Sequence, residues 1–256
     1  MKKLLILTTV FGVLMLAAAP AIAATLTVRS DSWMPFNGDP KSARPGYMIE
    51  VLKAIFEPKG IQIDYQLMPW ERSKDEVKKG AYDAIVGADK VEADGYTSPK
   101  ETFGRFRNAF FVLAANEWKY QGVASLNQVR LGVVEGYAYN DEVDEYIKKA
   151  PQGKVIAATG DDALPKLLKM LQAGRIDAIL EDATVIAHAL KANNIPFSQV
   201  LVAGDLGEAK DLYVAFSPAR ETSAKYSEIF SAGIVELRKS GKLKQILDRY
   251  NVKDWK

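Results

Sequence analysis

The sequence predicts an α/β fold built from two lobes, and three observations support this prediction. Short β-type runs alternate with amphipathic helical patterns along almost the whole chain, which is typical of helices layered on mostly parallel strands. A short motif is repeated in the two halves of the chain. Two further strands stand where they would cross from one lobe to the other. A ligand cleft is therefore expected between the lobes, at the carboxyl ends of the strands.

Apolar runs and their spacing predict the individual elements. Strands are expected at 26–29, 61–67, 84–86, 110–113, 131–134, 155–157, 178–180 and 213–216. Apolar stripes at helical spacing predict helices at 48–56, 164–171, 222–240 and 243–250. Asp161 or Asp162 is a plausible N-cap for the second of these helices, and Gly174 its C-terminal stop.

The repeated motif indicates two lobes built on one plan. Gly80-Ala-Tyr-Asp-Ala-Ile-Val recurs as Gly174-Arg-Ile-Asp-Ala-Ile-Leu, each time after a helical segment. In both copies glycine can end the helix in a left-handed conformation before a buried strand begins. A chance recurrence of a common helix-to-strand loop is the alternative.

The strands near 109–113 and 211–216 are predicted to cross between the lobes. This divides the chain into a first lobe of residues 24–112 and 212–256 and a second lobe of residues 113–211. The final helices should then pack back on the first lobe. About 230 residues suffice for two lobes of about 100 residues each.

Residues 1–23 have the features of a secretory signal peptide. Lys2 and Lys3 precede an apolar run from Leu4 to Leu16, and the small-residue triplet Ala-Ile-Ala ends at Ala23, where cleavage is expected. A membrane anchor, the alternative, would need about 20 apolar residues. Because the chain has no cysteine, neither a lipid anchor on cysteine nor a disulfide is expected. These features predict a freely soluble periplasmic protein.

Composition disfavours several classes of function. Without Lys2 and Lys3 the chain carries 32 Lys and Arg against 32 Asp and Glu, interspersed, so nucleic acid is not an expected partner. One histidine and no cysteine argue against metal clusters and thiol chemistry, and no cofactor is expected. His188 lies in a helical stretch and is interpreted as a packed or surface residue. The sequence contains no G-x-S-x-G, P-loop or G-x-G-x-x-G motif.

Several motifs, weak singly, together resemble one family in their order and spacing. They are Trp33-Met-Pro-Phe36, Gly46-Tyr-Met-Ile-Glu50, Gly80-x-Tyr-Asp-Ala-Ile, Ser125-Leu, Leu131-Gly-Val-Val-Glu-Gly136, Gly174-Arg-Ile-Asp-Ala-Ile-Leu-Glu-Asp182 and Leu237-x-x-x-Gly-x-Leu-x-x-Ile246. The chain resembles the family 3 extracellular solute-binding proteins, which include the amino-acid receptors of ABC importers. This resemblance implies a type II periplasmic-binding-protein fold, a small polar ligand, an inner-membrane ABC permease as partner, and a monomer.

The chain departs from the amino-acid receptors of this family at two places. Where those receptors carry a Thr-x-x-Arg type segment that holds the ligand carboxylate, this chain has Asp89-Lys90-Val-Glu-Ala-Asp, without the arginine. After Gly136, where threonines are usual, Tyr137-Ala-Tyr139 stands instead. A Pro-Trp-Glu-Arg segment at 69–72 resembles a divergent branch of the family. The ligand is therefore left open.

Candidate contacts in the first lobe lie in loops that follow strands. Trp33 and Phe36 could stack on a ligand or belong to the core. Trp70 and Arg72 follow the strand that ends near Met68; Arg72 could supply a cation or be a solvated residue of a first helical turn. Asp89 and Lys90 stand where the family anchors its ligand.

In the second lobe, Asp182 matches the position at which family members place an acid against the ligand ammonium, and helix capping is its alternative role. Glu135, Tyr137 and Tyr139 are expected where a helix begins, which suits an anionic or hydroxylated group; the two phenols could equally form a surface rim.

Three functions remain in competition. The leading hypothesis is a non-enzymatic binding module that closes on its ligand and delivers it to an importer. The second is the same clamp presented to a sensor kinase or a chemoreceptor. The third is an enzyme on this scaffold, like the dehydratases of prephenate-like acids, with Asp89, Lys90 or Glu135 as acid or base.

Overall fold

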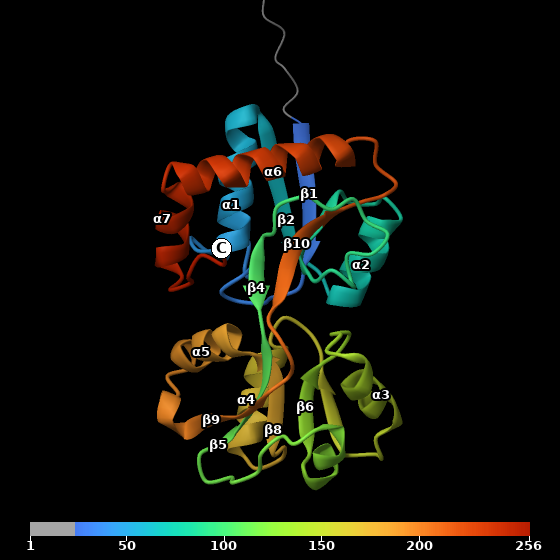
Figure 1. Cartoon of the computed structure of the whole chain (residues 1–256), viewed down its shortest axis with the longest axis vertical. Coiled ribbons are helices and arrows are strands. Elements are labelled where there is room, and N and C mark those ends of the chain that lie inside the picture. The colour runs from blue at the N-terminus through green and yellow to red at the C-terminus, as the bar shows by residue number, and fades with distance from the viewer. Residues whose placement is uncertain (1–23) are drawn as a thin grey trace, which may run out of the picture.

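Two five-stranded sheets, one in each lobe, form the frame of the molecule (Figure 1). The computed structural model describes residues 24–256, so the predicted signal peptide lies outside the described residues. The predicted α/β architecture of two lobes is confirmed. No helix within 24–256 combines the length and apolar character needed to cross a membrane.

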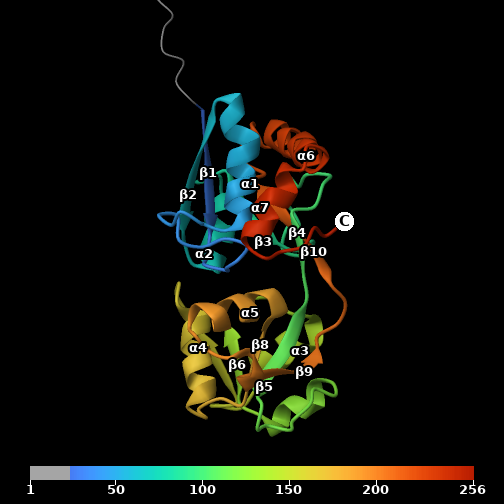
Figure 2. The same cartoon turned by 90° about the vertical axis from the view of Figure 1, so that its left-hand side faces the viewer.

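The first sheet has the strand order β2-β1-β3-β10-β4. Its strands are β1 (Ala24–Ser30), β2 (Ile61–Leu67), β3 (Ala84–Ala88), β4 (Gly104–Phe106) and β10 (Lys210–Phe216). β1 is parallel to β2 and β3, whereas β10 is antiparallel to β3 and β4. One face packs in a common core with α1 (Tyr47–Phe56), α6 (Ser223–Lys239) and α7 (Lys242–Arg249), and the other against α2 (Trp70–Lys78) (Figure 2).

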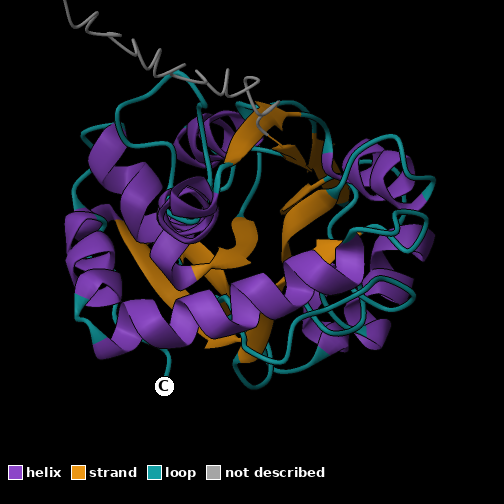
Figure 3. Ribbon diagram, turned by 90° about the horizontal axis from the view of Figure 1, so that it is seen from above, coloured by secondary structure: helices purple, strands orange, loops and turns teal. Residues whose placement is uncertain are grey.

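The second sheet has the order β7-β6-β8-β5-β9. It consists of β5 (Asn108–Leu113), β6 (Leu131–Val134), β7 (Val155–Ala158), β8 (Ala178–Asp182) and β9 (Val200–Asp205). α4 (Ala163–Gln172) and α5 (Ala183–Ala192) share a core with one face, and α3 (Asp141–Lys149) with the other. Three short 3-10 helices, Glu57–Lys59, Val123–Gln128 and Phe197–Gln199, complete the chain. In each lobe, helices therefore lie on both sides of the sheet. Seen from above, with the lobes one behind the other, helices surround the strands (Figure 3).

The repeated motif occupies equivalent places in the two lobes. Its copies form β3 and β8, each the third strand in its sheet. Asp83 Oδ2 accepts a hydrogen bond from the backbone N–H of Thr27 in β1 at 2.8 Å, and Asp177 Oδ2 accepts one from the N–H of Arg130, just before β6, at 2.8 Å. The two copies therefore make the same contact, as expected for lobes built on one plan.

Two connections join the lobes (Figure 1). β4 leads through Arg107 alone into β5, and β9 leads through residues 206–209 into β10. Residues 108–112 lie in the second sheet, not in the first lobe as predicted, and residues 210–211 lie in the first sheet. The change of sheet thus occurs between strands rather than within them, because each strand pairs along its length inside one sheet.

Candidate functional site

Three adjoining cavities lie between the lobes, and Asp31 borders all of them. The first is also lined by Trp33, Trp70 and Glu92 of the first lobe and by Tyr137 of the second. The second extends toward α4 and α5 of the second lobe, and the third lies between the start of α2 and the loops after β6 and β7. The region between the lobes is therefore a candidate ligand site.

The turn after β1 places Trp33 in this region. Its backbone N–H donates to the carbonyl of Asn37 at 2.8 Å, and its indole stacks on Phe36 with ring centroids 4.2 Å apart. Gly46 passes close to this turn with φ 105°, and a Cβ there would lie 2.3 Å from the Cα of Asn37. Only glycine fits this approach without displacement, so the Gly46 position helps to hold Trp33 at the lobe boundary.

Two hydrogen bonds join side chains of the two lobes directly. Trp33 Nε1 donates to Glu181 Oε1 at 2.9 Å, and the Tyr137 hydroxyl donates to Asp31 Oδ2 at 2.7 Å. Burial raises the pKa of Asp31 to about 6 and that of Glu181 to about 8; Glu92 adds to the first shift, and Asp182 and Asp31 add to the second. Two carboxyl groups with perturbed pKa values therefore lie at the boundary between the lobes.

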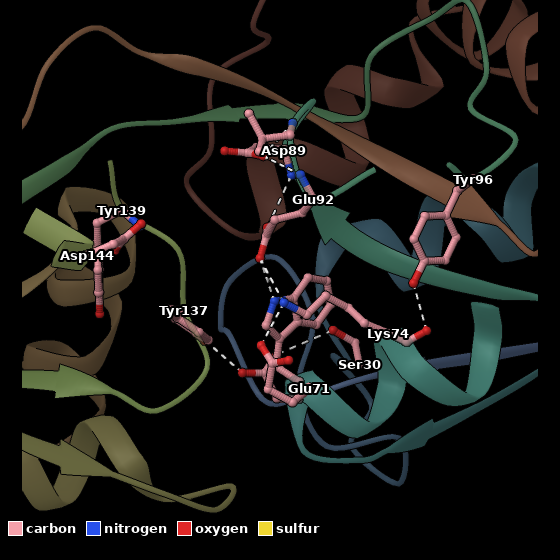
Figure 4. A network of polar contacts seen from close by, with 12 residues as sticks. Ser30, Glu71, Lys74, Asp89, Glu92, Tyr96, Tyr137, Tyr139 and Asp144 are labelled. Carbon is pink, nitrogen blue, oxygen red and sulfur yellow. Dashed lines mark hydrogen bonds and ion pairs between the residues drawn. The ribbon is translucent and has the colours of Figure 1, made fainter. Parts of the chain in front are cut away.

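A second polar network lies beside the first cavity (Figure 4). Trp70 Nε1 donates to Glu92 Oε1 at 2.7 Å, and Asp89 Oδ1 accepts from the backbone N–H groups of Val91 and Glu92. Lys210 Nζ contacts Asp89 Oδ2 at 3.1 Å and the carbonyl oxygen of Tyr139 at 2.9 Å. Asp89 therefore orders the turn after β3 and, through Lys210, is connected to the second lobe.

The structure brings some predicted site residues together at the cavities. Trp33, Trp70 and Tyr137 line the first cavity, and Glu135 borders the third from an exposed position. Phe36 is buried behind Trp33. Tyr139 is buried in the second-lobe core, where its hydroxyl accepts from the N–H of Val134 at 3.3 Å.

Other predicted residues lie apart from the cavities. The side chains of Arg72 and Lys90 are exposed, and neither lines one of the three cavities. Asp182 is the N-cap of α5: its Oδ1 accepts from the N–H groups of Thr184 and Val185, and its Oδ2 from the N–H of Arg107. Asp182 therefore makes the contacts of a helix N-cap, which is the alternative role expected from the sequence.

The expected helix start at Glu135 to Tyr139 is not found. These residues form a loop, and α3 begins at Asp141 with Asn140 as N-cap, whose Oδ1 accepts from the N–H of Val143 at 2.9 Å. Asparagine is a favoured N-cap, whereas Gly136 has φ 82°, which a helix does not use. This loop lets Tyr137 reach Asp31 across the boundary.

Sequence reasoning missed five acidic residues that line the cavities: Asp31, Glu71, Glu92, Asp161 and Glu181. Asp31 directly follows β1, so its position at a strand end was an available signal. Glu181 directly precedes Asp182 on β8, and side chains alternate between the two faces of a strand. That alternation is what separates the two side chains: Asp182 caps α5, while Glu181 lines the second cavity.

Comparisons with known proteins support the sequence resemblance. A search for family models found no match. The chain is 22% identical over 243 residues to a probable histidine-binding protein of Neisseria gonorrhoeae, covering 93% of this chain and 88% of the relative. It is 24% identical to the probable amino-acid-binding protein YxeM of Bacillus subtilis, covering 84% of this chain and 79% of the relative.

A third relative is an enzyme by name. The chain is 24% identical over 219 residues to the membrane-bound lytic murein transglycosylase F of Pseudomonas syringae pv. tomato, covering 82% of this chain. This chain spans only 41% of the length of that relative.

Solved structures share the fold. A mutant of ArgBP from T. maritima superposes with a TM-score of 0.72 at 17% identity, covering 89% of this chain and 95% of that one. A histidine kinase sensor domain with similarity to periplasmic binding proteins gives a TM-score of 0.68 at 22% identity, covering 88% and 95%. The ancestral amino-acid-binding protein AncCDT-1, a precursor of cyclohexadienyl dehydratase, gives 0.69 at 18%, covering 89% and 95%. The predicted resemblance to solute-binding proteins is thus confirmed, and the fold is that of the two-lobed periplasmic binding proteins.

Proposed function

We propose that this chain is a periplasmic solute-binding protein, which captures a small polar ligand between its lobes and delivers it to an ABC importer of the inner membrane. The observation that carries this proposal is the set of cavities lined by both lobes around Asp31. A ligand there contacts both lobes only when they are close together. Binding therefore favours the closed arrangement, and a partner can recognise the closed form.

Trp33, Trp70 and Tyr137 are our candidates for direct ligand contact. Two of them lie on the first lobe and one on the second, and all three line the first cavity. Asp89 has a supporting role in this proposal, because its oxygens are bonded to the turn after β3 and to Lys210.

Two other functions have supporting observations. The fold shared with a histidine kinase sensor domain supports a sensor, in which the closed lobes signal to a membrane receptor. The likeness to a lytic transglycosylase supports an enzyme, and Glu181, with a pKa raised to about 8, is a candidate proton donor. We favour a binding protein, since two relatives of similar length carry that name.

A thermal-shift screen tests the binding function. Protein freed of co-purified solute by unfolding and refolding is screened against amino acids, amines, organic acids and short peptides. A ligand at about 100 times its Kd adds about 2.7 kcal/mol, which for a chain of this size raises the Tm by about 5 to 10 °C. Small-angle X-ray scattering with the hit should show a smaller radius of gyration. Failure of every solute to shift the Tm would contradict the proposal.

Further measurements separate the three functions. Deletion of the gene should lower uptake of the radiolabelled ligand if the protein serves an importer. Unchanged uptake with a lost transcriptional response would indicate a sensor. Mass spectrometry of the ligand after hours with the protein should recover it unchanged, and a product would indicate an enzyme.

A further inference from the structure

The region between the lobes is strongly acidic, although the chain as a whole is balanced in charge. Six carboxylate residues border the three cavities: Asp31, Glu71, Glu92, Glu135, Asp161 and Glu181. Within residues 24–256, no Lys or Arg lines any of these cavities. His188 borders the second cavity, but burial and Lys191 lower its pKa from 6.5, so it is neutral at pH 7.

Two lysines beside the acidic residues, Lys74 and Lys210, already have partners. Lys74 Nζ contacts Glu71 Oε1 at 2.7 Å and Glu92 Oε1 at 3.6 Å. Lys210 is held by Asp89 and by the carbonyl of Tyr139. A ligand carboxylate in the cavities would therefore lie near acidic groups, and no lysine or arginine lining the cavities would pair with it. Its binding would cost free energy, because the carboxylate loses water and is repelled by the acidic groups.

Glu181 provides a second, independent indication of a positively charged ligand. Its side chain is buried, with the residue only 1% exposed, and it lines the second cavity. Oε1 accepts from Trp33 Nε1 at 2.9 Å and from the N–H of Asp182 at 2.8 Å. Its other oxygen, Oε2, accepts no hydrogen bond from residues 24–256. A carboxylate oxygen without a protein donor, on a side chain that lines a cavity, is best satisfied by a ligand that donates a hydrogen bond.

The walls of the first cavity are aromatic. Trp33, Trp70, Phe106 and Tyr137 line it together with Asp31 and Glu92. Trp33 lies edge-on to Phe106 and to Tyr137, with ring centroids 5.6 and 6.4 Å apart. The faces of such rings attract cations, and ammonium and guanidinium groups combine well with aromatic walls and carboxylates. Within 24–256 no cluster of three residues suits a metal ion, so these walls favour an organic cation.

We propose that the ligand is an organic amine or guanidine that carries no carboxylate, bound between the aromatic walls and the carboxylates Asp31, Glu92 and Glu181. This inference rests on the proposed binding function and specifies its ligand class. The proposed ligand differs from a zwitterionic amino acid because it lacks a carboxylate, and this difference can be tested directly.

Matched pairs of solutes isolate the ligand carboxylate. Putrescine differs from ornithine, cadaverine from lysine and agmatine from arginine only by a carboxylate. Isothermal titration calorimetry on the refolded protein should show that at least one of these amines binds, with a Kd at least ten times lower than that of its amino-acid counterpart. Equal or tighter binding of the amino acid in every pair would overturn the inference.

Variants connect the binding to the acidic residues. Glu92→Gln and Glu181→Gln should each raise the Kd of the amine tenfold or more, because each removes a carboxyl group that can pair with the bound cation. The exposed Glu228→Gln on α6 is the matched control and should leave the Kd unchanged; the Tm of each variant shows whether it is folded. An unchanged Kd in folded Glu92→Gln and Glu181→Gln would overturn the inference.

The same experiments distinguish this inference from the proposed function. If only anionic, neutral or zwitterionic solutes bind and close the lobes, the inference fails and the binding function stands. If no solute of any class binds, both fail.

Discussion

Glu181 illustrates how an interface between two lobes changes the chemistry of one residue. Its carboxyl group lies in the second lobe, but its hydrogen-bond donor, Trp33, comes from the first. Burial raises the pKa of Glu181 from 4.5 to about 8, and the nearby Asp182 and Asp31 add to the shift. Without a ligand cation, the protein therefore favours the protonated form of this group at neutral pH.

This raised pKa predicts a stability that depends on pH. The contribution of Glu181 to the free energy of unfolding is fully present below pH 4.5 and is lost as the pH rises toward about 8. The reason is that the carboxyl group ionises at a lower pH in the unfolded chain than in the folded one. Glu181→Gln keeps an acceptor for Trp33 and cannot ionise. We expect the ligand-free variant to be more stable than the wild type at pH 8 by about 1 to 3 kcal/mol, and nearly equal at pH 4.5. Urea unfolding at both pH values measures this difference. An equal difference at the two pH values would contradict the prediction, and Glu228→Gln serves as control.

At the residue scale, sequence reasoning found the aromatic part of the site better than the acidic part. Trp33 and Trp70 follow strands, and large aromatic residues in such loops are conspicuous in a sequence. The carboxylates depend on geometry that a sequence does not contain: Asp31 meets Tyr137 and Glu181 meets Trp33 only because two separate lobes approach each other. Lys90 was predicted at the family's anchor position, but its side chain is exposed.

In each lobe the aspartate of the repeated Gly-x-x-Asp-Ala-Ile element links the start of one strand to the neighbouring parallel strand: β3 to β1, and β8 to β6. Asp83 accepts from the backbone N–H and from the hydroxyl of Thr27, at 2.8 and 2.5 Å. Asp177 accepts from the backbone N–H and from the guanidinium of Arg130. Asp83 is buried, whereas Asp177 is half-buried. The same contact therefore has a drier environment in the first lobe than in the second.

This difference predicts unequal costs for equivalent substitutions. Asp83→Ala removes a buried acceptor from the N–H and the hydroxyl of Thr27 and should lower the free energy of unfolding by about 3 kcal/mol. Water reaches the half-buried Asp177 more easily, and for Asp177→Ala we expect about 1 kcal/mol. Urea denaturation of the two variants measures both values. Equal losses, or a larger loss for Asp177→Ala, would contradict this account.

The order of elements was largely predictable, and the exceptions have physical reasons. All eight predicted strands are present; most of them are buried and therefore appear in the sequence as apolar runs. β4 was missed because its three residues are too short for a pattern. β9 was missed because it pairs only with β5 at the edge of its sheet, so it carries exposed Leu201 and Val202 beside buried Val200 and Ala203.

At the scale of the whole molecule, two short connections join the lobes and would be the hinge of the proposed closure. They lie side by side: the N–H of Leu206 donates to the carbonyl of Asn108 at 2.8 Å, and the N–H of Arg107 donates to Asp182 at 2.9 Å. Closing the lobes brings Asp31, Glu92 and Glu181 into a space with little water. Without a cation, closing the lobes would bury ionised carboxylates, which costs free energy. A bound cation pairs with these carboxylates and so favours the closed form.

The coupling between closure and ionisation predicts that ligand binding releases protons. Burial raises the pKa of Asp31 to about 6, of Glu181 to about 8, and of Glu92 above 4.5, while Tyr137, Trp33 and Lys74 respectively counteract part of these shifts. An amine ligand stays charged up to pH 8, since alkylamines have pKa values near about 10. Its charge lowers the pKa of the carboxyl groups, so affinity should rise at least tenfold between pH 5.5 and pH 8.

Calorimetry at pH 7 in phosphate and in Tris tests this coupling, because the two buffers take up protons with different enthalpies. We expect a binding heat that depends on the buffer and corresponds to net proton release, and a smaller dependence in Glu181→Gln. Equal heats in both buffers, together with a Kd that does not change with pH, would show that the carboxyl groups are ionised before the cation arrives. The lobes would then close on their ligand without a change in protonation, and the acidic residues would act through fixed charge alone.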